Sequence, residues 1–522
     1  MKFNKIIALI LIFVLSPTLA ACSALTETSG NGAKAPAASD PNIPQSLIEL
    51  AEQLIPQHGP NGKFLMPINS PEAGSIAIST RAELEAIRNN LGAMYHLTAD
   101  IDLSGAEWVP IDNFRGIFDG QGHIIRNMTI TMGSYEYNGL FGSSVEGGEN
   151  VDIVYSVKNV GMEDTNIDVT RGNSFKFNSA SISGGGQNVI NCYNTGTISA
   201  SEYDEQHVNA SAMTAAGISV GGTSSYCYNT ATIIAVSTPH GSNAYAVGIN
   251  GGYGYVDNCF NSGSVTASAI SSTYAGGITI RGDVHNSYNI GTVSASSRSF
   301  TSAGGIAIGS STTRITNCFN TGEVSALSPD SRGQAAQAAG IICMSQGDYS
   351  IVNNCYNTGA VFSSGNAGGI GVSVTTISNC YNTGDISAVT TDRAIIYAGG
   401  INGSGSTINN CYNIGDVSAV AADRAYAGGI NGSGGTINNC YNIGNVSADS
   451  PNNYIGGIVS ETHGSVINSY SLNNYGSRIG VQLTSDEMKK AANFSEWDFD
   501  NVWAISSSVN SGYPHLIDVP HR

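Results

Sequence analysis

Short apolar segments separated by Gly and Asn recur along residues 190–470 of this chain. The clearest copies read A-GGI, then a turn, then TINNCYNIGDVSA, and the segments at 409–419 and 438–448 are nearly identical. Each apolar segment is short and rich in Ile, Val, Thr and Tyr, which is typical of strands. No unit contains a window with helical periodicity. The pattern therefore predicts three short strands in every unit.

The aromatic residue of the CYN segment recurs about every 31 residues. A period in this range is typical of solenoids and propellers. A propeller blade needs four strands and about 40 residues, and a leucine-rich repeat needs regularly spaced Leu, which is nearly missing from these units. We therefore predict an all-β chain, a parallel β-helix (solenoid) of about ten coils with small α/β caps at both ends.

Stacked coils would place each residue on its counterpart in the next coil, about 4.8 Å away. We expect ladders of aliphatic, aromatic and amide side chains, and glycines at turns whose conformation is closed to other residues. Strand alternation leaves open whether the Cys or the Tyr of the repeat faces the core. The expected ladders are Ile377, Ile408 and Ile437; Tyr381, Tyr412 and Tyr441; Asn379, Asn410 and Asn439; and Gly384, Gly415 and Gly444.

Other patterns flank the repeats. STRAELEAIRNN predicts a helix that begins with a capping box of Thr80 and Glu83, and TSDEMKKAANF predicts a second helix near the C-terminus. Open solenoid ends expose strand edges, so we expect caps whose Trp side chains plug the core: Trp108, Trp497 and Trp503. The predicted organisation is a signal peptide at 1–21, a flexible tether at 22–44, an N-terminal cap at 45–135, repeats at 136–478 and a C-terminal cap at 479–522.

The first residues predict export. MKFNK is basic, and IIALILIFVL is apolar but too short to span a membrane. LAAC resembles the bacterial lipobox, which implies cleavage before Cys22 and lipidation of that residue. The alternative is an ordinary secretory signal that happens to contain a cysteine. We predict a lipoprotein anchored to the bacterial cell membrane on its extracytoplasmic side.

The net charge argues against nucleic acid as a partner, and the positions of the cysteines argue against disulfides. With 39 acidic and 21 basic residues, the chain has a formal net charge of −18 and no basic stripe for nucleic acid. Eight cysteines occupy one slot of the repeat, where parallel orientation is poor geometry for disulfides. We therefore predict a row of reduced thiols. The slot cysteines are Cys192, Cys227, Cys259, Cys318, Cys355, Cys380, Cys411 and Cys440.

Both ends of the repetitive region resemble one family. ELEAIRNNLGAMYHLTADIDLSGAEWVPIDNFRGIFDGQGHIIRNMTI and the closing EMKKAANFSEWDFDNVWAISSSVNSGYPHL are similar to GLUG-motif proteins of bacterial surfaces, a repeat also found beside IgA-peptidase-type proteins. The resemblance implies a right-handed β-helix at the cell surface and no catalytic residue. Ala231 and Tyr226 depart from the repeat, in place of the turn Gly and the first Asn.

Few residues of the repeats could support catalysis or metal binding. Residues 190–470 contain no Lys and only six Arg, and HExxH does not occur. Asp385 and Asp416 follow turn glycines and could stack as a carboxylate or calcium site, but solvated turn residues are the simpler interpretation. Asp119 and His123 could form a catalytic pair, although a turn role is favoured. We therefore predict no enzymatic activity, no cofactor and no metal.

Two acidic–basic pairs occupy one position of adjacent coils: Asp392 with Arg393, and Asp423 with Arg424. Loops at one edge of a solenoid commonly bind ligands, whereas the alternative is a surface salt-bridge ladder. We predict a binding or adhesion scaffold whose partner is a glycan or protein of the host or of a neighbouring cell. A carbohydrate-active lyase or hydrolase and a ligand-free structural spacer are the alternatives.

Overall fold

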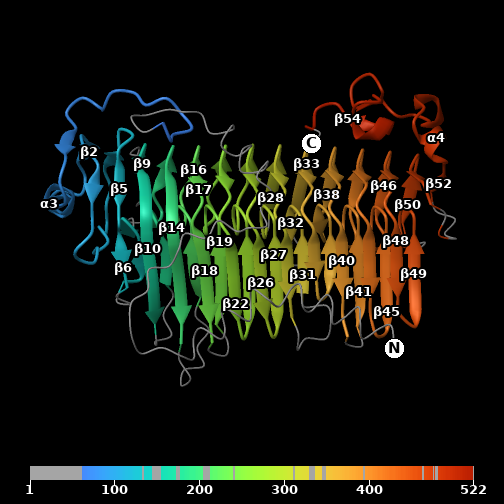
Figure 1. Cartoon of the computed structure of the whole chain (residues 1–522), viewed down its shortest axis with the longest axis horizontal. Coiled ribbons are helices and arrows are strands. Elements are labelled where there is room, and N and C mark those ends of the chain that lie inside the picture. Colours follow the sequence, from blue (N-terminus) through green and yellow to red (C-terminus); the bar gives the residue numbers. More distant parts are fainter. Residues whose placement is uncertain are drawn as a thin grey trace. The chain divides into compact units, whose positions relative to one another are not determined.

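The computed structural model of the chain shows a parallel β-helix (Figure 1), which confirms the predicted fold class. The predicted signal peptide, the tether and Cys22 lie outside the described residues. No helix in the described part of the chain has the length and apolar character needed to cross a membrane. The structure describes residues 62–131, 135–143, 155–171, 177–203, 212–238, 242–309, 312–328, 336–343, 349–391, 394–460, 464–473, 475 and 480–520.

One long sheet follows the stack through 14 parallel strands. Its residues pair in register, so that Ile377 lies opposite Ile408, and Ile408 opposite Ile437. These side chains are buried and form the predicted aliphatic ladder. The strands are β1 (Ile76–Ile78), β2 (Met94–Leu97), β4 (Ile117–Asp119), β9 (Ser156–Lys158), β13 (Asn188–Ile190), β16 (Ser224–Ser225), β20 (Val256–Asp257), β24 (Val284–His285), β28 (Thr312–Thr316), β33 (Tyr349–Asn353), β38 (Thr376–Ser378), β42 (Thr407–Asn409), β46 (Thr436–Asn438) and β50 (Ser465–Ile467).

A second sheet of 11 parallel strands is built from the segments that end in the GG of each repeat. Its strands are β7 (Tyr137–Asn138), β11 (Phe177–Ala180), β15 (Ala212–Ala216), β19 (Asn243–Val247), β23 (Ser272–Gly276), β27 (Phe300–Gly304), β31 (Ala336–Ala339), β36 (Asn366–Gly368), β41 (Ile395–Gly399), β45 (Arg424–Gly428) and β49 (Asn452–Gly456). The Tyr-Asn and Val-Ser-Ala segments pair separately, as in β43 (Tyr412–Asn413) and β44 (Val417–Val420), and complete each coil.

The first Asn of the NCYN segment decides which side chain faces the core. Asn379, Asn410 and Asn439 adopt φ values of 52°, 51° and 51°, a left-handed conformation that Asn tolerates better than most residues. The resulting bend places Cys411 in the main core, whereas Tyr412 belongs to a separate cluster outside the coil. Both are buried, and the tyrosine rings stack with centroids 4.9–5.0 Å apart.

The turn glycines have a different role from the one we predicted. Gly384, Gly415 and Gly444 do not have positive φ; the left-handed residue of each segment is its first Asn, five residues before the glycine. A Cβ added to Gly415 would instead lie 2.1 Å from the carbonyl oxygen of Gly384 in the adjacent coil. Close approach between backbones therefore requires glycine here.

The second Asn of the segment forms the main amide ladder. Asn413 Nδ2 donates to Asn442 Oδ1 at 2.8 Å and to the Gly415 carbonyl at 2.7 Å, while Asn382 Nδ2 donates to Asn413 Oδ1 at 2.8 Å. These three Asn side chains are buried. The ladder that we predicted at the first Asn also exists, but it is half-exposed and longer, at 3.2 Å between Asn410 and Asn379.

The slot cysteines point the same way in the core. The Cys411 backbone N–H donates to Cys440 Sγ at 3.4 Å, and Cys411 Sγ donates to the Asn409 carbonyl at 3.2 Å. Burial raises the pKa of the Cys411 thiol well above its usual value, and it raises the pKa of Cys343, outside the slot, to about 12. Such thiols react slowly, because the thiolate is the nucleophile.

We expect the eight slot cysteines and Cys343 to resist iodoacetamide in the native full-length chain and to react fully in urea. Burial excludes the reagent from all nine side chains. Mass spectrometry of peptides from native and denatured samples measures both states. Two slot cysteines found joined in a disulfide would contradict the parallel thiol row.

The predicted capping box is present, and a second one, which was not predicted, begins the C-terminal helix. Thr80 and Glu83 begin α3 (Arg81–Glu85), and Thr484 and Glu487 begin α4 (Ser485–Met488). Each helix is shorter than its sequence pattern predicted, since a 3-10 turn follows it. Trp108 is buried in the main core cluster.

The C-terminal segment covers the side of the coils, so the prediction that Trp497 and Trp503 plug the core is wrong. Trp503 lies 6.2 Å from the Tyr412 ring and 6.1 Å from the Tyr441 ring. The Tyr381 hydroxyl donates to the Pro520 carbonyl at 2.6 Å. The bend at Asn turns the tyrosines outward, and this aromatic row then needs an apolar cover.

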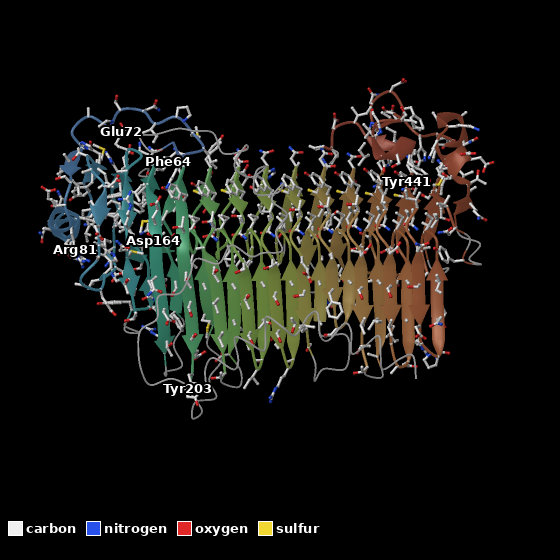
Figure 2. All side chains as sticks on the ribbon, in the orientation of Figure 1. Phe64, Glu72, Arg81, Asp164, Tyr203 and Tyr441 are labelled. Atoms are coloured by element: carbon white, nitrogen blue, oxygen red, sulfur yellow. The ribbon has the colours of Figure 1, made fainter. Side chains whose placement is uncertain are left out.

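A segment near residue 64 covers the other end of the same aromatic row. Phe64 packs 5.4 Å from the Tyr193 ring, and the Tyr228 hydroxyl donates to the Lys63 carbonyl at 3.0 Å. Lys63 also pairs with Glu163 at 2.6 Å. Figure 2 labels Phe64 and, near the other end of the row, Tyr441.

Candidate binding face

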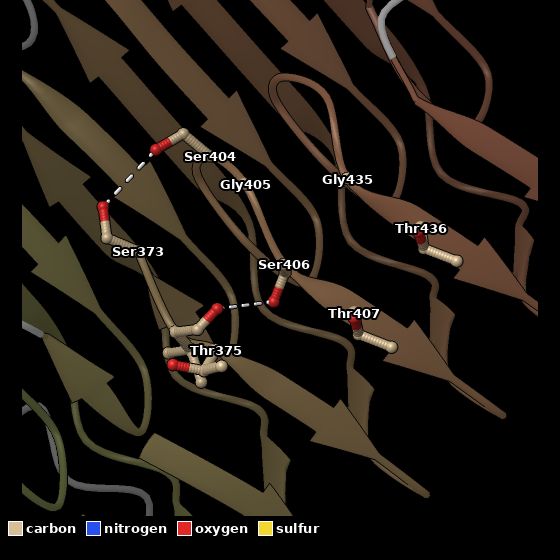
Figure 3. Close-up of a pocket in the computed structure, with 9 residues that line it drawn as sticks. Ser373, Thr375, Ser404, Gly405, Ser406, Thr407, Gly435 and Thr436 are labelled. Atoms are coloured by element: carbon tan, nitrogen blue, oxygen red, sulfur yellow. Dashed lines mark hydrogen bonds between the residues drawn. The ribbon is translucent and has the colours of Figure 1, made fainter. Parts of the chain in front are cut away.

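A shallow, open depression of about 580 Å³ lies where the turns enter three neighbouring strands, β38, β42 and β46 (Figure 3). Hydroxyl groups and glycine backbone dominate its lining. Ser373 and Ser404 share a hydrogen bond of 3.4 Å, and Ser406 Oγ donates to the Val374 carbonyl at 2.7 Å. The lining residues are Ser373, Val374, Thr375, Ser404, Gly405, Ser406, Thr407, Gly435 and Thr436.

The local sequence explains the open shape. The turns read GSGST and GSGGT, and Gly405 and Gly434 both adopt φ of 61°, which glycine reaches without strain. No atom lies within 4 Å of a Cβ built on Gly405. Short side chains on tight turns therefore leave space above the strand starts.

The outward side of the same strands carries polar rows. Thr376 lies opposite Thr407, and Thr407 opposite Thr436, along the stack. Two residues further on, Asn438 Nδ2 donates to Asn409 Oδ1 at 2.9 Å. These side chains are half-buried or exposed, and all are uncharged.

Exposed tyrosines lie at or just before the first residues of other strands in the same sheet. Tyr253 is 71% exposed and Tyr255 42% exposed just before β20, and Tyr349 is 68% exposed at the start of β33. The Arg281 guanidinium lies 4.8 Å from the Tyr253 ring centroid, and the His285 ring lies 5.2 Å from that of Tyr255. Partial burial raises the pKa of Tyr255, which holds its hydroxyl neutral.

Sequence reasoning missed these tyrosines, because neighbouring coils do not repeat a tyrosine at the same position, as Thr312 opposite Tyr349 shows. The available signal was composition: Tyr253 and Tyr255 interrupt a turn that is otherwise Gly-rich, GGYGYVDN.

One buried polar atom near the depression has no partner among the described residues. Asn402 is fully buried, and its Nδ2 donates to the Ser404 carbonyl at 2.9 Å and to Asn431 Oδ1 at 3.2 Å. Gly371 occupies the equivalent position in the preceding coil, so the Asn row ends there. Asn402 Oδ1 is therefore left without a donor.

The carboxylates of Asp385 and Asp416 form hydrogen bonds between neighbouring coils. Asp385 Oδ1 accepts the Asp416 backbone N–H at 3.0 Å, and Asp416 Oδ1 accepts the Asn445 N–H at 2.9 Å. Each carboxylate therefore caps a backbone group of the next coil. The described residues contain no group of three or more potential metal ligands.

Asp119 and His123 are not brought together as a pair. Asp119 accepts the Gln121 backbone N–H at 3.0 Å and Asn159 Nδ2 at 2.9 Å, as a turn residue does. The His123 ring instead lies 3.2 Å from Asp100.

The predicted binding loops lie elsewhere. Asp392 and Arg393 are outside the described residues. Asp423 directly precedes β45, and Arg424 begins that strand in the 11-stranded sheet, opposite Ile395 and Asn452. No ion pair of Arg424 with another described residue is formed. A binding role for these loops stays a prediction.

The chain has little sequence similarity to known proteins. No family model and no curated protein matches the chain. Among solved structures, the chain is similar to a putative immunoglobulin A1 protease from Bacteroides ovatus, at 16% identity and a TM-score of 0.30, covering 89% of this chain and 98% of that one. It is also similar to an IgA1 protease, at 13% identity and a TM-score of 0.21, covering 76% of this chain and 21% of that one.

These names agree with the predicted link to IgA-peptidase-type proteins, while the GLUG and lipoprotein assignments stay predictions. They contradict our prediction that the chain is not an enzyme, and that prediction is not maintained. At these identities and TM-scores, no activity or residue role passes to this chain.

Proposed function

We propose that the chain is a lipid-anchored bacterial surface protein whose β-helix is a rigid scaffold for binding and adhesion. The observation that supports this proposal most is the in-register stacking of side chains. Buried Asn side chains bond from coil to coil at 2.8 Å, and aromatic rings stack beside them. Such a stack resists bending and presents equivalent outward positions at a constant spacing.

The proposed partner is a glycan or protein on a host or neighbouring cell, and the membrane is reached through the lipid on Cys22. The polar stretch after Cys22, SALTETSGNGAKAPAASDPN, has the composition of a flexible linker. A linker of this kind would let the scaffold meet ligands away from the membrane surface.

We expect Cys22→Ser to abolish acylation and to leave an uncleaved precursor, because the lipid attaches to this thiol and processing follows it. Metabolic labelling with a fatty acid and detergent partitioning measure the two effects. Cys343→Ser, which changes a cysteine outside the proposed lipobox, is the control and should be processed normally. If the Cys22 variant is processed and partitions as the unmodified chain does, the proposed lipid anchor at Cys22 is contradicted.

Binding itself is tested with the purified full-length chain in detergent on arrays of glycans and of host proteins. A reproducible, saturable ligand supports the scaffold proposal. Arrays that return no ligand would favour the ligand-free spacer.

A further inference from the structure

The exposed tyrosines and the hydroxyl-lined depression belong to one surface. We call it the polar face, and define it as the outward side and turn edge of β20, β24, β28, β33, β38, β42 and β46. Tyr253 and Tyr255 mark one end, Tyr349 the middle, and Ser404 and Thr436 the other end. With neighbouring strands about 4.8 Å apart, the face extends roughly 29 Å along the stack. That length suits an extended polymer better than a small molecule.

We propose that the polar face binds a neutral, extended polysaccharide. This inference rests on the proposed scaffold function and names its ligand class. A sugar ring presents an apolar face of C–H groups and a rim of hydroxyls. Tyr253 and Tyr349 offer flat, amphipathic rings, and the rows of Thr, Ser and Asn offer both donors and acceptors.

Charge favours a neutral ligand. Between β33 and β46 the described outward side chains are uncharged, and the whole chain carries a formal charge of −18, which repels polyanions. The other end of the face carries charges of both signs: His285 lies opposite Asp257, Arg281 covers the Tyr253 ring two residues before Asp283, and Arg314 is exposed on β28. The basic side chains of the face are therefore confined to the end at β20, β24 and β28, where Asp257 and Asp283 lie among them, and no cationic row for a phosphate- or carboxylate-bearing polymer continues along β33, β38, β42 and β46.

The backbone argues against a polypeptide. Strands β38, β42 and β46 each pair on both sides, so this face offers no free strand edge for main-chain pairing. Tyr253 lies against Arg281 and Tyr255 against His285, so the exposed tyrosines do not form a continuous apolar groove.

Affinity electrophoresis of the full-length chain in detergent tests the proposal, with gels containing a β-glucan, a mannan or a xylan, or the anionic polygalacturonate. We expect retardation by at least one neutral polymer and none by polygalacturonate. Tyr349→Ala and Tyr253→Ala should each weaken binding roughly tenfold or more, as for an aromatic anchor. Tyr203→Ala, at a tyrosine 61% exposed away from this face, is the matched control and should bind normally.

The variants separate the possible outcomes. Circular dichroism and urea melts of each variant establish that the fold is retained. Equal binding by all three variants, or retardation only by polygalacturonate, would overturn the polar face as a neutral-glycan site. A protein ligand found on the arrays together with no glycan binding would also overturn it, yet leave the scaffold function standing. If neither a glycan nor a protein ligand is found, both the polar-face proposal and the scaffold proposal are overturned.

Discussion

Asn413→Ala should lower the free energy of unfolding by about 3 kcal/mol or more. The side chain is fully buried and bonds to both adjacent coils and to the Gly415 carbonyl in its own turn. Alanine leaves polar groups in two coils without partners, at roughly 1–3 kcal/mol for each buried group. A urea melt of the full-length variant measures the loss.

Asn409→Ala is the matched control, because it changes the same residue type in the same coil. Asn409 is half-buried and bonds to Asn438 on the outward side, where water can replace the lost hydrogen bond. We expect a change below about 1 kcal/mol. Equal destabilisation by the two variants would mean that the inner amide ladder does not hold the coils together.

Gly415→Ala should be more disruptive still, at about 4 kcal/mol or more. Its Cβ would lie 2.1 Å from the Gly384 carbonyl oxygen and 2.6 Å from the Gly384 carbonyl carbon. Both obstacles are backbone atoms, so relief requires the coils to separate and the amide ladder beside them to stretch. A large fall in the urea midpoint or loss of soluble protein is the expected result.

Gly92→Ala is the control for the glycine substitution. Gly92 is exposed in a turn, and its Cβ would meet only the Arg115 side chain, 3.8 Å away. We expect a change within about 0.5 kcal/mol. If Gly415→Ala were as mild as this control, the close approach of the two coils would be contradicted.

The chain contains one natural exception at this position. Ala231 replaces the turn glycine and is buried in the core. The preceding coil is irregular there: Gly196 has a φ of 114°, and the pairing of β10 (Gly161–Arg171) with β14 (Tyr193–Glu202) shifts register between Met162 and Thr165. Alanine is thus found next to a coil that departs from the regular path.

Sequence periodicity was sufficient to predict the coil, its three strands and the aliphatic and aromatic ladders. The capping box of Thr80 with Glu83 was predicted from a local motif. Periodicity could not orient the CYN segment, because the direction of Cys411 and Tyr412 depends on one left-handed residue, Asn410. Alternation along a strand carries no information about such a bend.

The binding face was beyond sequence reasoning for a related physical reason. Tyr253 lies just before β20 and Tyr349 begins β33, and only the stacking of the strands between them brings the two residues to one side of the sheet. The docking of Trp503 on the aromatic row is likewise a long-range contact, which local periodicity does not encode. The repeated positions were sufficient to predict the β-helix. The proposed ligand surface depends on residues that differ from one repeat to the next.

Successive coils place the same Asn and Tyr side chains on one another, so one coil could be removed and the ladders would still match. Asn413 and Asn442 are 29 residues apart, and removing residues 409–437 would set Asn382 directly beside Asn442. Tyr356 would then take the place of Tyr381 opposite Pro520, so the C-terminal cap would meet the same type of side chain. The length of the stack can therefore change in steps of one coil, because each junction already fits its new neighbour.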